Sequence, residues 1–434
     1  MKKFLALILA LVMALSLVAC GGNSGAQGEG DGDAATGSVY YLNFKPEAEE
    51  AWQALAKTYT DQTGVPVKVV TAASGEYETM LVSEMDKDAA PTLFQCNEGG
   101  VATWGDFCYD LSDSAVYNEL ASKDYALKNA DGEVISIAYC LETYGIIVNK
   151  ALLEQAGHSL DEITDFDSLK AVADDIHARA DELGFDAFTS AGLDGSSSWR
   201  FSGHLSNMPL FYEFRDDGIS SKPATIKGTY LDNYKKVWDL YITDSATTGA
   251  ALLTATGDQA EAEFGEGKAV FYQNGTWEYS NLTEKFGMNP DDLTMIPIYC
   301  GVEGEEKAGL CTGTENYWSV NKNAKEEDIK ATLDFLYWVV TSEEGTTMMA
   351  EQFGACPFNS SKAPSNPFSA LANEYVANGC YPVTWAFNYT PAVNDWRAAV
   401  VDALSKYTAG DGSWDDVKTA FVEGWATQYA NENA

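Results

Sequence analysis

Residues 39–70 read VYYLNFKPEAEEAWQALAKTYTDQTGVPVKVV, and this stretch decides the fold class. Residues 39–44 are apolar or aromatic apart from Asn43, which is typical of a strand. Pro46 stands where a first helical turn accepts proline. The apolar residues that follow at helical spacing are Trp52, Leu55, Ala56 and Tyr59. Gly64 ends this helix and residues 65–70 form the next strand, so the stretch predicts a strand–helix–strand unit with a parallel sheet.

The same alternation continues along the chain. Further strands are predicted at residues 92–95, 146–148, 269–272 and 295–298, and further helices at residues 78–85 and 326–340. Between residues 39 and 434 the sequence shows no internal repeat and no second linker. A chain of two-domain size without such a linker favours an α/β protein whose two lobes are joined by several crossings.

The N-terminus carries an export signal. Lys2 and Lys3 precede residues 4–19, an apolar run shorter than the about 20 residues that a membrane-spanning helix needs. The run ends in Leu-Val-Ala-Cys-Gly-Gly, which resembles the bacterial lipobox, where the cysteine is diacylated on sulfur and becomes the mature N-terminus. We therefore expect residues 1–20 to be a lipoprotein signal, and Cys20 to anchor the protein to the outer face of the cell membrane. An ordinary cleaved signal that contains a cysteine is the alternative.

A linker follows the signal. Residues 21–38 are rich in Gly, Asp, Ser, Ala and Thr and contain no large apolar side chain. Such a segment cannot bury enough surface to offset its ordering entropy, so we expect a flexible tether with a reach of roughly 20–25 Å. Asp31 and Asp33 lack the remaining ligand spacing of a calcium loop, and we interpret them as part of this solvated linker.

The chain is strongly acidic. It holds 65 acidic and 27 basic residues, for a formal net charge of −38. A polyphosphate backbone would repel such a protein, so the composition argues against nucleic-acid binding. We attribute the excess to solubility at the cell surface rather than to a cationic ligand.

Seven cysteines remain besides the one in the lipobox, at positions 96, 108, 140, 300, 311, 356 and 380. None shows Cys-x-x-Cys spacing, which argues against a zinc site or a redox motif. Export permits disulfides, and Cys300 and Cys311 flank a predicted connection between strands. In a bacterium that lives without oxygen, however, all seven would stay reduced. The odd count leaves at least one unpaired, and both alternatives remain open.

Four segments carry a family resemblance. They are Tyr144–Gly157 (YGIIVNKALLEQAG), Phe264–Glu278 (FGEGKAVFYQNGTWE), Tyr317–Asn321 with the helix and the Thr-Ser-Glu-Glu-Gly that follow it, and Trp414–Trp425. In this order, over nearly the whole exported chain, they resemble the extracellular solute-binding proteins of carbohydrate ABC importers (family 1, maltose-binding-like). Departures lie at Cys96 and residues 190–200, and they bear on the ligand rather than on the fold.

The resemblance implies a fold and a role. The fold is a two-lobed periplasmic-binding-protein-like α/β fold of type II, with three hinge crossings and a ligand cleft between the lobes. We expect the first lobe to comprise residues 39–147 and 307–362, and the second residues 148–306 and 363–434. The role is capture of a carbohydrate, a di- or oligosaccharide, by lobe closure and its delivery to the transmembrane permease subunits of an ABC transporter. We expect the protein to act as a monomer.

Sugar binding requires apolar plates for the pyranose rings and polar groups for the hydroxyls. The chain has 11 Trp and 23 Tyr, and Trp199, Trp277 and Trp385 stand in polar or turn-like stretches, which favours the cleft over the core. The family resemblance further places Trp277 at a turn facing the cleft. The hydroxyl acceptors, with solvated surface as the alternative for each, are Glu98, Glu142 and Glu278. The complete set of candidate ligand contacts is Trp277, Glu278, Trp199, Arg200, Trp385, Asn97, Glu98, Glu142, Tyr144 and Asn274.

The sequence argues against an enzyme. Its three histidines, His158, His177 and His204, have no metal-ligand spacing, and neither Gly-x-Ser-x-Gly nor a phosphate-binding Gly-x-x-x-x-Gly-Lys motif occurs. We therefore expect no catalytic residue, metal or cofactor. A glycoside hydrolase remains an alternative, because it needs only two carboxylates among aromatics. A surface adhesin is another, although it would not need the hinge-like segments.

Overall fold

Strand β1 (Val39–Asn43) pairs in parallel with β2 (Val67–Thr71) in the computed structural model, which describes residues 37–433. The register aligns Val39 with Val67 and Asn43 with Thr71. Between the two strands, η1 (Pro46–Ala48) leads into α2 (Glu49–Thr63), which ends at Gly64 in the left-handed conformation (φ 77°) that glycine adopts without strain. The predicted strand–helix–strand unit is therefore confirmed.

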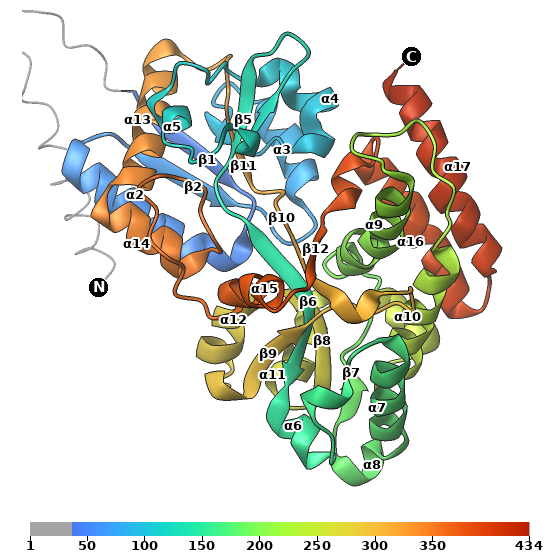
Figure 1. Cartoon of the computed structure of the whole chain (residues 1–434). Coiled ribbons are helices and arrows are strands. Elements are labelled where there is room, and N and C mark those ends of the chain that lie inside the picture. The colour runs from blue at the N-terminus through green and yellow to red at the C-terminus, as the bar shows by residue number, and fades with distance from the viewer. Residues whose placement is uncertain (1–36, 434) are drawn as a thin grey trace, which may run out of the picture. The chain divides into compact units, whose positions relative to one another are not determined.

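The first sheet has six strands in the order β2-β1-β3-β11-β5-β4. The strands added here are β3 (Leu93–Phe94), β4 (Ala126–Lys128), β5 (Val134–Ala138) and β11 (Tyr317–Val320). The helices of this lobe, besides α2, are α3 (Tyr77–Met85), α4 (Val101–Trp104), α5 (Ala115–Asn118), α13 (Glu326–Thr341) and α14 (Glu343–Gln352). Their apolar faces meet in a core that includes Trp52, Trp318 and Phe335, and Figure 1 shows α2, α13 and α14 beside this sheet.

The second sheet follows the order β12-β10-β6-β8-β7, and β9 also pairs with β6. Its strands are β6 (Glu142–Asn149), β7 (Asp186–Phe188), β8 (Ala269–Gly275), β9 (Leu293–Ile296), β10 (Ala308–Gly313) and β12 (Tyr381–Thr384). Its helices are α6 (Lys150–Gln155), α7 (Phe166–Ala178), α8 (Ala180–Leu183), α9 (Ser206–Asp217), α10 (Leu231–Thr243), α11 (Gly257–Gly265), α12 (Glu278–Ser280), α15 (Phe368–Ala377), α16 (Val393–Ala409) and α17 (Trp414–Glu432).

Short helical turns join these elements. The 3-10 turns are η2 (Glu98–Gly100), η3 (Gly105–Phe107), η4 (Lys123–Tyr125), η5 (Leu160–Glu162), η7 (Gly249–Thr254), η9 (Pro290–Asp292), η10 (Glu305–Lys307) and η11 (Ala386–Tyr389). Two turns are π-helical, η6 (Arg200–Leu205) and η8 (Asn281–Lys285).

The chain passes between the two sheets three times. It leaves the first sheet after β5, returns to it between β10 and β11, and leaves it again before β12. Strand β6 lies in the second sheet along its whole length, and so does β10. The sheet therefore changes before Glu142 and after Gly313, whereas the sequence placed the lobe boundaries at 147/148 and 306/307.

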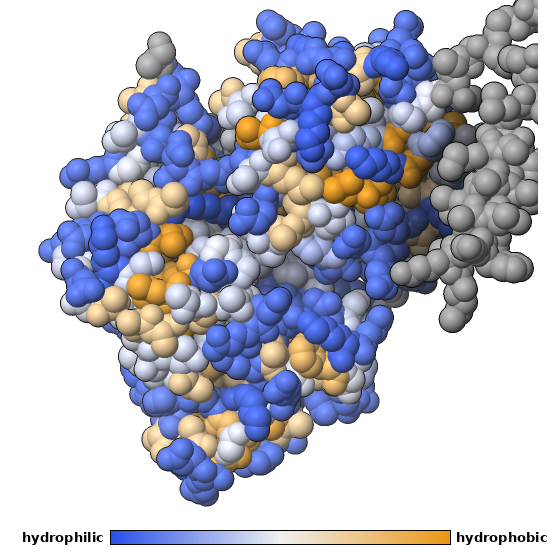
Figure 2. All heavy atoms as spheres, turned by 180° about the vertical axis from the view of Figure 1, so that it is seen from behind, coloured by the Kyte–Doolittle hydropathy of each residue, from blue (hydrophilic) through white to orange (hydrophobic). Residues whose placement is uncertain are grey.

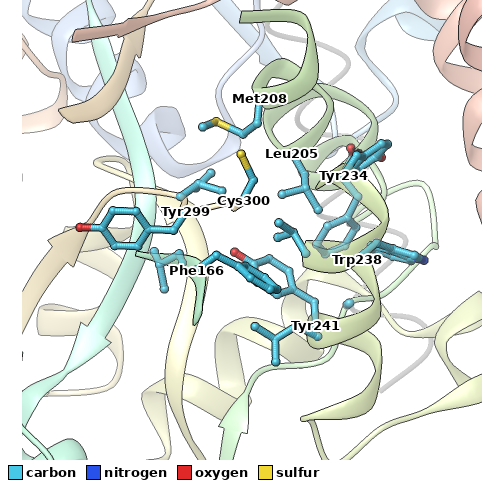
Figure 3. Packing of buried hydrophobic residues seen from close by; sticks show 14 of the residues in the cluster. Phe166, Leu205, Met208, Tyr234, Trp238, Tyr241, Tyr299 and Cys300 are labelled. Atoms are coloured by element: carbon cyan, nitrogen blue, oxygen red, sulfur yellow. Dashed lines mark hydrogen bonds between the residues drawn. The ribbon is translucent and has the colours of Figure 1, made fainter. Parts of the chain in front are cut away.

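The core of the second lobe is built around α10. Its Tyr234, Trp238 and Tyr241 are spaced one helical turn apart and are at most 2% exposed. Figure 3 shows them with Phe166 of α7 and Met208 of α9 in one packed cluster. This rigid packing supports the strands whose ends carry the candidate site.

Several predictions concern residues outside 37–433. The signal peptide, the lipidation site Cys20 and the linker up to residue 36 lie there, so the structure gives no account of them. The seven other cysteines are described, and all of them are free thiols. Within the described part of the chain, no helix combines the length and the apolar character that crossing a membrane requires. Figure 2 shows one face of the molecule as mostly hydrophilic, with small scattered hydrophobic areas.

Candidate functional site

Five polar or aromatic side chains follow the carboxyl ends of strands that have a parallel neighbour. Lys45 follows β1 and Glu98 follows β3 in the first sheet, while Trp277 and Glu278 follow β8 and Trp385 follows β12 in the second. In open α/β sheets, ligands bind beyond the carboxyl ends of the strands. The strand ends therefore mark where the candidate site lies.

An aromatic cluster forms at the ends of the second-sheet strands; it comprises Tyr144, Trp199, His204, Trp277 and Trp385. Tyr144 of β6 stacks on His204, with ring centroids 3.8 Å apart and planes 10° from parallel. His204 meets Trp199 edge-on at 5.0 Å and lies 5.5 Å from Trp277, while Trp385 lies 5.3 Å from Tyr144. Tyr144, His204 and Trp385 are buried, whereas Trp199 and Trp277 are half-buried. The cluster thus offers large apolar rings on rigid backbone.

The π-helical turn η6 brings His204 into this cluster. Pro209, the fourth residue of α9, has no N–H to donate to the carbonyl of Leu205, so the regular hydrogen-bond ladder is interrupted there. The turn before it widens to the π form, an arrangement that is frequent at functional sites. Burial lowers the pKa of His204 well below its usual value, with the charges of Arg397 and Arg200 acting in the same direction, so the imidazole is neutral.

Only one of the two carboxyl oxygens of Glu278 has a hydrogen-bond partner among the described residues. The Nδ2 of Asn274 donates to Oε1 of Glu278 at 2.8 Å and also contacts the Tyr272 hydroxyl at 2.6 Å. The other oxygen, Oε2, is buried without a partner among residues 37–433. Burial raises the pKa of Glu278 to about 8, helped by the charges of Glu261 and Glu47. At neutral pH this carboxyl therefore keeps its proton and has a hydrogen bond to give.

Glu98 repeats the arrangement in the first lobe. Its Oε1 accepts a hydrogen bond from the Tyr317 hydroxyl at 2.7 Å, and its Oε2 is buried with no partner in the described chain. Burial raises the pKa of Glu98 to about 7, although the bond from Tyr317 opposes this rise. The side chain of Asn97 accepts from the backbone N–H of Gly100 at 3.1 Å and caps η2, which fixes the turn that carries Glu98.

Segments of both lobes line a small pocket beside Glu98. Its volume is about 200 Å³ including space open to solvent, and it is lined by Asn97, Glu98, Gly99, Glu315, Phe387, Asn388 and Val393. Trp385 stacks on Phe387 at 5.6 Å, so the pocket adjoins the aromatic cluster.

The structure gives Glu142 and Arg200 internal partners instead of a place in this pocket. Glu142 accepts from Lys45 Nζ at 2.6 Å and from Asn316 Nδ2 at 2.6 Å, so both of its oxygens are engaged. Arg200 is 1% exposed and donates to the Gln273 and Ser190 carbonyls and to the Ser197 hydroxyl. Their position in the fold is that of internal braces, with Glu142 joining the lobes and Arg200 fastening the turn after β7 to β8.

Sequence reasoning missed several groups at the site. Lys45, Phe387 and Asn388 follow strand ends, a signal that would have found them. The Nζ of Lys45 lies 5.4 Å from the centroid of the Trp277 ring. His204 had no such signal, because its position depends on the π-helical turn.

Glu278→Gln is expected to change how stability depends on pH. The folded pKa of about 8 exceeds the ordinary value of 4.5, so the folded state holds a proton that the unfolded chain releases. This group therefore costs the folded state stability as pH rises from 4.5 through 8. Glutamine removes that cost, and we expect its Tm at pH 9 to exceed the wild-type value by on the order of 5 °C, with little difference at pH 5.

Thermal unfolding followed by circular dichroism from pH 5 to 9 measures this difference. Glu284→Gln is the matched control, because Glu284 is exposed and lies in the turn that follows α12. Parallel Tm curves for wild type and Glu278→Gln would contradict a buried, protonated Glu278.

Solved sugar-binding proteins share this fold. The solute-binding protein RafE in complex with raffinose has a TM-score of 0.70 at 15% identity, covering 90% of this chain and 99% of its own. A sugar transporter from Bacillus licheniformis in complex with stachyose has a TM-score of 0.68 at 17% identity, and the match covers 90% of this chain and 99% of the transporter. The GacH receptor of Streptomyces glaucescens has a TM-score of 0.66 at 17% identity, and the match covers 91% of this chain and 99% of the receptor. These likenesses establish the two-lobed periplasmic-binding-protein-like α/β fold.

The sequence itself assigns the family. A family model described as bacterial extracellular solute-binding protein matches residues 54–377, which include elements of both sheets. The match covers most of the chain and includes β3, β8 and the residues that follow them. The chain therefore belongs to the bacterial extracellular solute-binding protein family, whose members bind solutes rather than catalyse reactions.

Proposed function

We propose that this solute-binding protein of an ABC importer captures a saccharide of at least two rings and delivers it to the permease. One observation carries the proposal. Glu98 and Glu278, one from each lobe, are each fixed by a hydrogen bond on one oxygen and carry a second, buried oxygen without a partner among the described residues. A buried polar atom without a partner costs free energy, and a ligand hydroxyl would remove that cost.

The aromatic cluster supports a saccharide over another polar solute. Sugar rings present C–H faces that pack on Trp and Tyr, while their hydroxyls need fixed polar groups nearby. Trp277 is half-buried and directly precedes Glu278, so an apolar plate and a hydrogen-bonding group are adjacent in the chain. The ligands in the structural neighbours, raffinose and stachyose, are saccharides, which agrees with this chemistry.

Capture by lobe closure follows from the division of the site. A ligand that contacts Glu98 from the first lobe and Trp277 from the second interacts with both only when the lobes are together. Such a ligand shifts the population toward the closed state, and the permease then distinguishes loaded from empty protein.

We also propose that the protein is held at the membrane through a lipid on Cys20. The support is the order of the apolar run, Leu-Val-Ala, Cys20 and two glycines. Labelling of the expressed wild type and of Cys20→Ser with a radioactive fatty acid tests the anchor, because only the wild type should incorporate the label. Equal incorporation, or none in the wild type, would refute it.

A thermal-shift panel tests the function. The panel contains raffinose, stachyose, acarbose, chitin oligosaccharides and their monosaccharide units, with an amino acid and a dipeptide as non-sugar controls. A ligand that binds only the folded state raises Tm by mass action. At a free-ligand concentration of 100 times Kd, it adds about 2.7 kcal/mol to the free energy of unfolding. We expect an oligosaccharide to give the largest shift. Sustained release of reducing ends would indicate a hydrolase, and a shift from the peptides alone would refute a sugar ligand.

A further inference from the structure

Arg397 of α16 carries a guanidinium that pairs with no carboxylate of the described residues. Of the four arginines in the chain, Arg179 and Arg215 form surface ion pairs, whereas Arg200 and Arg397 form none with residues 37–433. The Nε atoms of Arg200 and Arg397 are both buried without a partner in the described chain, but Arg200 donates three hydrogen bonds inside its lobe through its other nitrogens.

The surroundings of Arg397 hold its guanidinium in one place. Its central carbon lies 5.4 Å from the centroid of the Phe387 ring, and Phe387 is 1% exposed. A Cβ added to Gly203 would lie 2.2 Å from Nη2 of Arg397, so the guanidinium lies directly against the π-helical turn η6. An arginine that merely reached into solvent would contact neither the Phe387 ring nor this turn.

Glu315 lines the same pocket as Phe387, whose ring Arg397 contacts. It lies between β10 and β11 and forms no ion pair within residues 37–433. Burial raises the pKa of Glu315 above its ordinary value, and the charge of Arg397 partly opposes that rise. The pocket thus has a carboxyl group in its lining and a cationic donor over its Phe387 ring, and no ion pair joins the two among residues 37–433.

Two further polar atoms in the pocket are fixed and unused. Asn388 donates from Nδ2 to the Thr314 carbonyl at 3.1 Å, which leaves its Oδ1 buried without a partner among residues 37–433. Oε2 of Glu98 is likewise buried without a partner among residues 37–433. The backbone N–H of Phe387 donates to Asn207 Oδ1 at 3.1 Å, which holds the backbone that carries the ring.

We propose that Glu98, Glu315, Phe387, Asn388 and Arg397 form a second subsite, which binds a neutral terminal ring of the saccharide. This subsite rests on the proposed function and is separate from the one at Trp277 and Glu278. Phe387 closes the apolar wall of the pocket, Arg397 donates to hydroxyl oxygens, and the carboxyl and amide oxygens accept from hydroxyl hydrogens. A hydroxyl does both at once, which suits a donor and an acceptor held apart.

The charges in the subsite favour a neutral ring over an acidic one. A uronate carboxylate that reached this subsite would meet the carboxyl groups of Glu315 and Glu98, and the ionised form of either would repel it. A neutral hydroxyl-bearing ring meets no such repulsion.

The path between the subsites sets a minimum length for the ligand. Phe387 stacks on Trp385 at 5.6 Å, Trp385 lies 6.3 Å from His204, and His204 lies 5.5 Å from Trp277. Aromatic rings therefore continue from one subsite to the other, and a monosaccharide fills only one of them.

Arg397→Met tests the subsite by calorimetry with stachyose, raffinose, melibiose and galactose, or with a chitin oligosaccharide series if the panel favours it. Methionine keeps an unbranched apolar stem and removes the donors. We expect the affinity for the oligosaccharides to fall about tenfold or more. The affinity for the monosaccharide should change by less than a factor of about two. Arg397→Lys keeps the positive charge but lacks the planar, paired N–H donors of the guanidinium, so it should recover only part of the lost affinity.

The controls separate this subsite from the fold and from the proposed function. Arg215→Met removes a surface arginine paired with Asp216 and should leave every affinity unchanged. Equal losses for all saccharides, no loss for any, or tighter binding of a uronate-terminated oligosaccharide than of its neutral counterpart would overturn the second subsite alone. A wild type that binds no saccharide would overturn the proposed function and the subsite with it.

Discussion

Trp277→Ala is expected to weaken saccharide binding at least tenfold, or by about 1.4 kcal/mol, with little effect on folding. The indole is half-buried at the end of β8, and its six-membered ring lies against Gly275, where a Cβ would be 2.2 Å from it. Its partners His204 and Trp199 are themselves in the aromatic cluster, so alanine removes a plate without opening the main core. Titration calorimetry with the best oligosaccharide of the panel measures the loss.

Two further variants sharpen this result. Trp277→Phe keeps an aromatic face and should recover most of the affinity. Trp338→Ala removes a ring of the same size that packs 5.1 Å from Tyr59 in the first-lobe core, so it should lower Tm and leave affinity unchanged. Unchanged affinity in Trp277→Ala would remove Trp277 from the ligand site.

The sequence predicted the local units of the fold closely. The strands expected at residues 39–44 and 65–70 are Val39–Asn43 and Val67–Thr71 in the structure, and the helix between them ends at Gly64 as expected. Such units depend on periodicity and on a glycine at a turn, both of which are visible within about 30 residues. They could therefore be inferred without knowledge of the rest of the chain.

The lobe boundaries could not be inferred in the same way. All eight residues of β6 are buried, because the strand is covered on both faces and has neighbours on both edges. A strand that is buried along its whole length does not alternate between core and solvent, so its sequence carries no sign of the sheet to which it belongs. The expected boundary therefore fell inside a strand that is continuous in the second sheet.

The candidate site shows the same division between local and distant information. The turn signal at Asn274 and Gly275 pointed to Trp277 and Glu278, and the structure gives Glu278 a buried oxygen that has no partner in the part of the chain it describes. The sequence also predicted Glu142 as a hydroxyl acceptor, but in the structure it pairs with Lys45 and Asn316, which lie 97 and 174 residues away in the chain. A polar side chain's role depends on whether distant segments already satisfy it, and one sequence cannot show that.

Glu142→Gln is expected to lower the free energy of unfolding by about 3 kcal/mol, because it leaves a buried lysine short of a counter-charge. Lys45 and Glu142 are 5% and 6% exposed, and Nζ of Lys45 lies 2.6 Å from Glu142 and 3.0 Å from Glu47. Burial alone would lower the pKa of Lys45, but the two carboxylates outweigh burial and raise it, so the lysine stays charged. Urea unfolding followed by tryptophan fluorescence measures the change.

A double variant distinguishes a buried ion pair from a packing defect. Lys45→Met with Glu142→Gln removes both charges, so it should be less destabilised than the sum of the two single variants. Asp61→Asn breaks the exposed pair between Asp61 and Lys57, whose side chains are 64% and 75% exposed, and should cost less than about 1 kcal/mol. Because Lys45 precedes η1 in the first lobe and Glu142 begins β6 in the second, additive losses would mean that this ion pair does not couple the lobes.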